Sequence, residues 1–174
     1  MYIVGQVVGF IYLFFLVLSF QFKEKENMIV TRVSSAITAS IHYLLIGAIT
    51  GALAQLNNAI VTLLAAKLMH KELTTKIISI IIFSMVYIAI AIYGYKNPSD
   101  VLPSIGFILT TIVVLLANTR QIRLAQFAIS PLFLIYNIVN HSYAGIITET
   151  IVLLSCVMGI LRLDLKWKNK KSKS

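Results

Sequence analysis

Hydrophobic residues along this chain fall into seven long runs that are separated by short polar breaks. Each run holds about 18 to 21 residues, enough for a helix to cross the roughly 30 Å hydrocarbon core of a bilayer. The breaks are too short to hold a soluble domain. The pattern therefore predicts an all-α integral membrane protein with seven transmembrane helices. The predicted spans are Tyr2–Phe22, Thr31–Thr50, Gly51–Leu68, Thr74–Tyr93, Val101–Asn118, Ile122–Asn140 and Tyr143–Leu163.

The positive charges show which side of the membrane each break faces. All but one of the 15 Lys and Arg residues lie near the first, third and fifth breaks or near the carboxyl terminus. Lys96, in the fourth break, is the exception. Because short loops rich in Lys and Arg stay in the cytoplasm, the amino terminus is predicted outside and the carboxyl terminus inside.

Composition supports a membrane protein and disfavours nucleic-acid binding. The chain is 59% hydrophobic and 12% charged, too apolar to hide its surface in a water-soluble core of 174 residues. Its net charge of +9 comes from bases at the ends of the predicted spans. These bases, and above all the basic tail, are suited to anionic lipid headgroups, so the expected partner is the lipid bilayer and no nucleic acid is expected.

The predicted topology implies an internal repeat. Spans one to three and spans five to seven would run in the same order and orientation, with span four reversing the chain between them. This 3+1+3 arrangement is the parallel repeat known in small transporters. His42–Gln55 overlays on Tyr136–Glu149 without a gap, and this overlay pairs Gly51 with Gly145 at the two predicted outer turns.

The repeat predicts how the chain is divided. Two three-helix bundles flank a linker helix, and a basic cytoplasmic tail follows. The predicted ranges are 1–70 for the first bundle, 71–97 for the linker transmembrane helix, 98–165 for the second bundle and 166–174 for the tail.

Polar residues recur on one face of several predicted spans. In the third span, Gln55, Asn58 and Thr62 are three and four residues apart, which places them on one helical face. Such residues either hydrogen-bond neighbouring helices together or line a path for a polar solute. For the second hypothesis, the candidate solute-binding residues are Gln55, Asn57, Asn58, Tyr136, Asn137 and His42.

Glu149 is the only acidic residue deep in an apolar run. An ionised carboxylate there costs several kcal/mol unless it is paired or hydrated, so this group either protonates or faces a wet cavity. It is interpreted either as a hydrogen-bond partner of His141 or Tyr143, or as a proton-coupling group. No Lys or Arg lies in the middle of a predicted span, which disfavours a strongly anionic solute.

Two further features concern helix packing and helix bending. Gly5 and Gly9 form a small-xxx-small pair that suits close helix approach or a homodimer. Pro131 interrupts the sixth span and is a candidate hinge. Neither the Cys nor the scattered His and acidic residues form a metal-ligand pattern, so no metal or cofactor is expected. No nucleophile with a base and an orienting partner is evident either, and an enzyme is not expected.

Short motifs in a fixed order along nearly the whole chain resemble those of a known family. They are Gly5-Gln6-x-x-Gly9, Ser40–Gly47, Asn58-Ala59-Ile60-x-Thr62-Leu63, Leu102-Pro103-x-Ile105-Gly106, Leu134–Asn137, Gly145-Ile146-Ile147-x-Glu149 and Gly159-Ile160-x-Arg162. The chain resembles the YgjV-like bacterial inner-membrane protein family. That family is in turn similar to the SWEET and PQ-loop small-solute carriers, although the Pro-Gln pair of PQ-loop carriers is absent here.

Two functions from different classes follow from these observations. The favoured hypothesis is a small-solute transporter of the bacterial inner membrane, which carries a neutral or weakly cationic polar metabolite by alternating access between the two bundles. The alternative is a non-transporting helix bundle that stabilises or regulates a membrane partner. A carrier requires the polar faces to converge on one cavity, whereas a structural bundle requires a dry interior.

Overall fold

The computed structural model describes residues 1–19, 25–68, 71–117 and 119–159. Within these ranges the chain is helical and contains no strand, so the all-α prediction is confirmed. The elements are α1 (Tyr2–Ser19), α2 (Lys25–Leu45), α3 (Ile49–Leu68), α4 (Leu73–Tyr93), the 3₁₀ turn η1 (Pro98–Val101), α5 (Leu102–Leu116), α6 (Thr119–Val139) and α7 (Tyr143–Gly159).

Three of the helical segments are long and apolar enough to cross a membrane. They are Tyr2–Ser19, Leu73–Tyr93 and Pro98–Leu116. Shorter apolar helical segments cover Ile49–Ala65, Leu124–Val139 and Tyr143–Met158. Most large apolar side chains of α4 are exposed, among them Ile82 and Met85, as expected for a helix that faces lipid on most sides.

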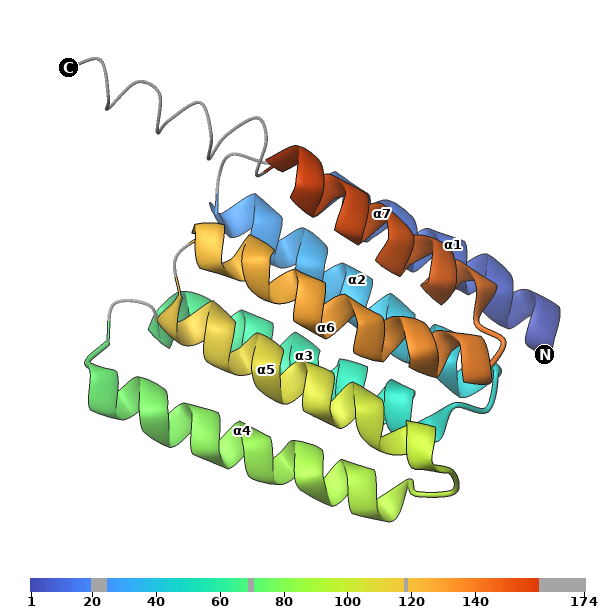
Figure 1. Cartoon of the computed structure of the whole chain (residues 1–174), viewed down its shortest axis with the longest axis horizontal. Helices are drawn as coiled ribbons and strands as arrows, with labels where there is room; N and C mark the ends of the chain where they lie inside the picture. Colours follow the sequence, from blue (N-terminus) through green and yellow to red (C-terminus); the bar gives the residue numbers. More distant parts are fainter. Residues whose placement is uncertain (20–24, 69–70, 118, 160–174) are drawn as a thin grey trace.

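Six of the helices close into a ring, in the order α1, α2, α3, α5, α6 and α7, each packed against the next. The contact between α7 and α1 closes the ring, and α4 packs outside it against α3 and α5 (Figure 1). Ring closure is reinforced by α1, whose Tyr2 hydroxyl and Gln6 amide both donate to the carbonyl of His141, at 2.6 and 2.9 Å. Consequently α2 and α6 face each other across the middle of the ring.

The turns after α2 and α6 have the same backbone geometry. Gly47, with φ of 82°, and His141, with φ of 51°, each lie in the left-handed region just after a helix. The amide of Ala48 donates to the Tyr43 carbonyl at 2.8 Å, and the amide of Ser142 donates to the Asn137 carbonyl at 2.9 Å. Both turns are therefore Schellman motifs, which satisfy the last carbonyls of the helix. We call this end of the bundle the turn end.

This geometry corrects one prediction about the turns. Gly51 and Gly145 do not lie in the turns but inside α3 and α7. In the overlay predicted from the sequence, the residues with positive φ, Gly47 and His141, also fall on each other. The sequence favours the glycine shared by both segments as the turn residue, but the left-handed positions are Gly47 and His141, four residues earlier.

The largest error in the predicted spans concerns the second one. It was predicted to be Thr31–Thr50, whereas α2 is Lys25–Leu45. Charged residues stopped the apolar run at its start, but a polar first turn does not prevent a helix from extending. Arg32, at the start of the predicted span, therefore lies about two turns inside α2. The predicted tail 166–174 lies outside the described residues.

Gly5 and Gly9 allow close helix packing within the chain. A Cβ atom at Gly9 would lie 2.5 Å from the Cβ of Ala144 on α7 and 2.8 Å from Nδ1 of His42 on α2. A Cβ at Gly5 would similarly meet the side chain of Ile46 at 2.9 Å. Both glycines are buried. They therefore provide close helix approach inside this chain, and this pair is not a free surface for a homodimer.

Candidate functional site

Near the turn end, the interior of the ring is filled by hydrogen-bonded side chains from α2 and α6. The Tyr43 hydroxyl donates to Oδ1 of Asn137 at 2.7 Å. The Tyr136 hydroxyl accepts the backbone N–H of Gly51 at 2.9 Å. The rings of Tyr43 and Tyr136 are 5.8 Å apart. We call His42, Tyr43, Tyr136 and Asn137 the aromatic layer; all four are buried.

His42 is held by protein groups on both sides of its ring. Nδ1 lies 2.7 Å from the carbonyl of Gly5, and Nε2 lies 2.7 Å from the Ser142 hydroxyl. Because a backbone carbonyl only accepts, Nδ1 carries the hydrogen and donates to Gly5, and Nε2 accepts the hydrogen of the Ser142 hydroxyl. His42 thus joins α1, α2 and the α6–α7 turn, and in this conformation no ring nitrogen is left for a solute.

Two glycines allow the aromatic layer to approach α3 and α7. A Cβ atom at Gly51 would lie 2.8 Å from the ring of Tyr136. A Cβ atom at Gly145 would collide with the side-chain amide of Asn137. Gly51 and Gly145 therefore mark the faces of α3 and α7 that point into the ring. Nδ2 of Asn137 is buried without a hydrogen-bond partner among the described groups.

The interior face of α3 changes character below the aromatic layer. Gln55, Asn58 and Thr62 follow Gly51 at four, seven and eleven residues and so share its face. All three are half-buried.

The two edges of this face are more tightly covered than its middle. On one edge, Ala52 packs in a cluster with Tyr43 of α2. On the other edge, Ala54 packs in a cluster with Tyr87 of α4 and Phe107 of α5. Both alanines are almost completely buried. The polar middle of the face is therefore the part that neighbouring helices leave least covered.

Glu149 lies one helical turn beyond Gly145, on the interior side of α7. The hydroxyl of Ser130 on the adjacent helix α6 lies beside its carboxyl group. Oε2 of Glu149 is buried and has no hydrogen-bond partner among the described groups. His141 and Tyr143, the partners suggested by the sequence, are both exposed and are not the groups beside the carboxyl. The interpretation of Glu149 as their hydrogen-bond partner was therefore wrong.

Further polar groups lie toward the end of the bundle that is opposite the turn end. Gln126 on α6 donates from Nε2 to the Ser130 hydroxyl at 3.0 Å. Arg32 on α2 is half-buried and lies near Cys156 of α7. Cys156 is itself buried within the bundle. Arg32 therefore adds a base to this end of the interior, about two helical turns from the start of α2, whereas the prediction concerned the middle of the spans.

Two predicted residues point elsewhere. Asn57 is buried beside Tyr87 of α4, so it faces the α3–α4 contact and not the interior face that holds Asn58. Pro131 lies inside α6 and is exposed on its outer side. Its role as a hinge stays a prediction. Within the described ranges there is also no group of three or more His, Cys, Asp and Glu residues that could hold a metal.

Sequence reasoning placed Ser130 on the polar face of the sixth span, together with Gln126 and Asn137, but missed Arg32 and Ser142 as members of the interior. Arg32 could have been found, because extending the overlay toward the amino terminus pairs it with Gln126 on α6. Ser142 carries no such signal, because it lies in the turn between α6 and α7 and not on a helical face.

Residues 3–166 match the family model Imp-YgjV, which is described as a bacterial inner membrane protein. The chain belongs to this family. It is a multi-pass protein of the bacterial inner membrane, which agrees with its apolar helices. Neither a curated protein nor a solved structure shows significant similarity to the chain.

The contact between Tyr43 and Asn137 predicts a measurable loss of stability. Tyr43→Phe removes the donor and leaves Oδ1 of Asn137 buried without its partner, which should cost about 1–3 kcal/mol. The free energy of unfolding in mixed micelles measures this change. The control is Tyr143→Phe, because Tyr143 is exposed and the same hydroxyl is removed there. Equal stability of both variants would mean that the interior hydrogen bond contributes nothing.

Proposed function

We propose that this member of the Imp-YgjV family is a small-solute transporter that works by alternating access between two three-helix bundles. The observation that carries this proposal is the interior face of α3. It is sealed against Tyr136 at Gly51, yet half-buried and polar at Gln55, Asn58 and Thr62. A dry structural bundle has no need for polar groups in the least covered part of its interior.

A 3+1+3 repeat is the architecture that we propose for this carrier, with α1–α3 and α5–α7 as the two bundles. The ring supports it, because the contact of α1 with α7 is matched by the contact of α5 with α3. The matching Schellman turns support it as well. In the overlay, Tyr43 and Asn137 are equivalent positions, and a contact between equivalent residues is what a two-fold relation produces near its axis.

The aromatic layer would then be the closed gate of this conformation. Its residues connect both bundles at the turn end, through the bonds of Tyr43 to Asn137, Tyr136 to Gly51 and His42 to Ser142. The half-buried polar face begins directly below it. In our proposal the turn end faces outside, so this conformation is closed to the outside and a solute enters the interior from the cytoplasm.

The interior indicates the class of solute. Amide groups of Gln55, Asn58 and Gln126 offer both donors and acceptors, as sugars, nucleosides and amino-acid-like compounds require. Glu149 favours a neutral or weakly cationic solute. Because Arg32 also lies inside the bundle, a zwitterion fits too, with its carboxylate toward Arg32 and its cation toward Glu149.

Uptake into liposomes by the purified protein, against a broad panel of metabolites, tests the proposed activity. Asn58→Leu should raise the solute concentration for half-maximal uptake at least several-fold, because it removes a donor and an acceptor from the interior face. Glu149→Gln should remain folded and make uptake independent of pH, since the amide cannot release a proton.

The matched controls for these variants lie on exposed positions. Thr150→Leu places the same leucine on the outer side of α7, and Glu72→Gln neutralises an exposed carboxylate. Both should leave uptake unchanged. If no metabolite in the panel is taken up, or if Asn58→Leu and Glu149→Gln transport like the controls, the non-transporting bundle that serves a membrane partner becomes the better hypothesis.

The orientation is predicted separately from the activity. Paired reporters fused after residue 174, one active only in the cytoplasm and the other only in the periplasm, should report a cytoplasmic carboxyl terminus. The expectation rests on the side of the membrane where the Lys and Arg residues gather. A reporter inserted beside Lys96 should give the opposite result. A periplasmic carboxyl terminus would contradict the proposed orientation.

A further inference from the structure

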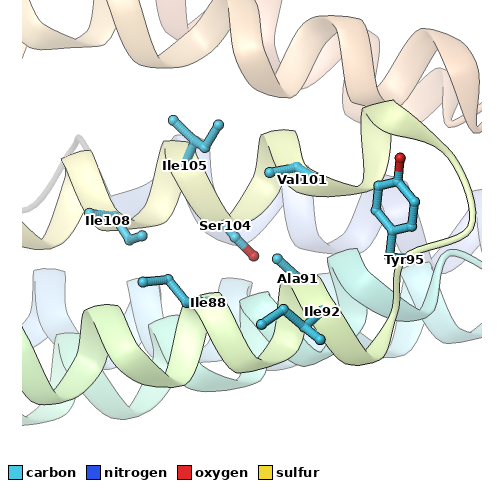
Figure 2. Close-up of a pocket in the computed structure, with 8 residues that line it drawn as sticks. All are labelled: Ile88, Ala91, Ile92, Tyr95, Val101, Ser104, Ile105 and Ile108. Carbon is cyan, nitrogen blue, oxygen red and sulfur yellow. The ribbon is translucent and has the colours of Figure 1, made fainter.

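A groove separate from the polar interior lies between α4 and α5. It has a volume of about 410 Å³, within the range of small-molecule sites. Figure 2 shows the isoleucines Ile88, Ile92, Ile105 and Ile108 along it, with Ala91 between them on α4. Ile88, Ile92 and Ile105 are also exposed, and both helices that form the groove are long and apolar enough to span the bilayer. The groove therefore opens toward lipid.

One polar side chain points into this groove without a partner. Ser104 on α5 is 2% exposed, and its hydroxyl has no hydrogen-bond partner among the described groups. Figure 2 shows the hydroxyl directed from α5 toward α4 at Ala91. Other hydroxyls of the same helix bond their own backbone, such as Thr111 to the Phe107 carbonyl at 2.8 Å. A buried hydroxyl that does not do so is available to a ligand that carries an acceptor.

An aromatic side chain lies at one end of the groove, and a positively charged residue follows it in the chain. Tyr95 lies at this rim, next in the chain to the exposed Lys96 (Figure 2). The nearby carboxylate of Asp100 is buried and accepts the backbone N–H groups of Lys96 and Asn97, at 3.0 and 2.8 Å. The carboxylate is thus held against the backbone, and the Lys96 ammonium is the charge presented to the surroundings.

The groups that line the groove lie at different depths in the membrane. The hydroxyl of Thr50 donates to the carbonyl of Gly94 at 3.0 Å, so the α4–α5 connection lies at the turn end of the bundle. Ser104 is two residues after the start of α5, about 3 Å along the helix. The groove thus runs from an aromatic rim next to Lys96, past the Ser104 hydroxyl, to Ile88 and Ile108 deeper in the membrane. This is the order of phosphate, ester carbonyl and acyl chain in a phospholipid.

We propose that the α4–α5 groove is a binding site for one anionic phospholipid of the leaflet at the turn end. The headgroup phosphate contacts Lys96, an ester carbonyl accepts the hydrogen of the Ser104 hydroxyl, and one acyl chain lies along the isoleucines. The small side chain of Ala91 leaves the space that this chain occupies. The site does not depend on the transport activity, because none of its residues belongs to the polar interior.

Native mass spectrometry of the full-length protein, released from detergent micelles with added phosphatidylglycerol or phosphatidylcholine, tests this site. The wild type should retain one phosphatidylglycerol molecule at detergent concentrations that remove phosphatidylcholine. Ala91→Phe should abolish retention, since the ring fills the groove. The matched control is Ala89→Phe, because Ala89 is on the same helix and exposed but does not line the groove. It should retain lipid like the wild type.

Two conservative variants keep the test independent of folding. Lys96→Gln should retain both lipids equally, and Ser104→Ala should weaken retention of both lipids several-fold. Retention of phosphatidylglycerol by Ala91→Phe at the wild-type level would overturn the site. An unchanged headgroup preference in Lys96→Gln would overturn the assignment of the phosphate, and equal loss of lipid from Ala89→Phe and Ala91→Phe would overturn the role of the groove.

Discussion

The hydrogen bond from the Tyr43 hydroxyl to Oδ1 of Asn137 connects α2 and α6, the two helices that face each other across the ring. In a membrane the helices gain little from burying apolar surface against one another, so specific polar contacts and close packing must hold them together. Both partners are buried, and neither can turn to water for a substitute. The geometry of the whole turn end is consistent with this constraint. Gly51 and Gly145 leave room for the two side chains, and the Schellman turns bring α3 and α7 back beside them.

Below this contact, the interior is built differently. The aromatic layer is buried and almost fully hydrogen-bonded, whereas Gln55, Asn58, Thr62 and Arg32 are half-buried on faces that point into the same ring. Along the interior face of α3, the structure changes from sealed at the turn end to polar and less covered beyond it, as one conformation of an alternating-access carrier requires. In such a carrier, opening the turn end would break the contact of Tyr43 with Asn137. The free energy of this hydrogen bond would then be part of what solute binding must supply to shift the equilibrium between the two conformations.

The apolar runs predicted the all-helical fold, and the bounds of α3, α4 and α7 lie close to the predicted spans at the ends that the structure describes. The start of α2 could not be predicted from hydropathy, because the helix continues through charged residues that ended the apolar run. The interior position of Glu149 follows from the cost of exposing a carboxylate to lipid. The partner of Glu149 does not follow, since Ser130 is distant in sequence and its contact depends on how α6 and α7 pack. Asn57 and Asn58 are adjacent in sequence but point to different neighbours. Helical periodicity shows that they lie on different faces of α3, but which face points into the ring depends on how α3 is oriented in the bundle.

In the proposed carrier, the interior is polar and open at the end opposite the turn end. The reactivity of single cysteines along α3 with a water-soluble reagent tests this feature most directly. Cys156 is replaced by Ala, and cysteines are introduced at Asn58 and Thr62 on the interior face and at Leu56 and Ile60 on the exposed, lipid-facing side. A membrane-impermeant maleimide is then added to right-side-out or inside-out vesicles. We expect positions 58 and 62 to react only in inside-out vesicles, and positions 56 and 60 to react in neither, because a thiol in lipid does not ionise. Protection of positions 58 and 62 in both kinds of vesicle would mean a dry interior and would contradict this account.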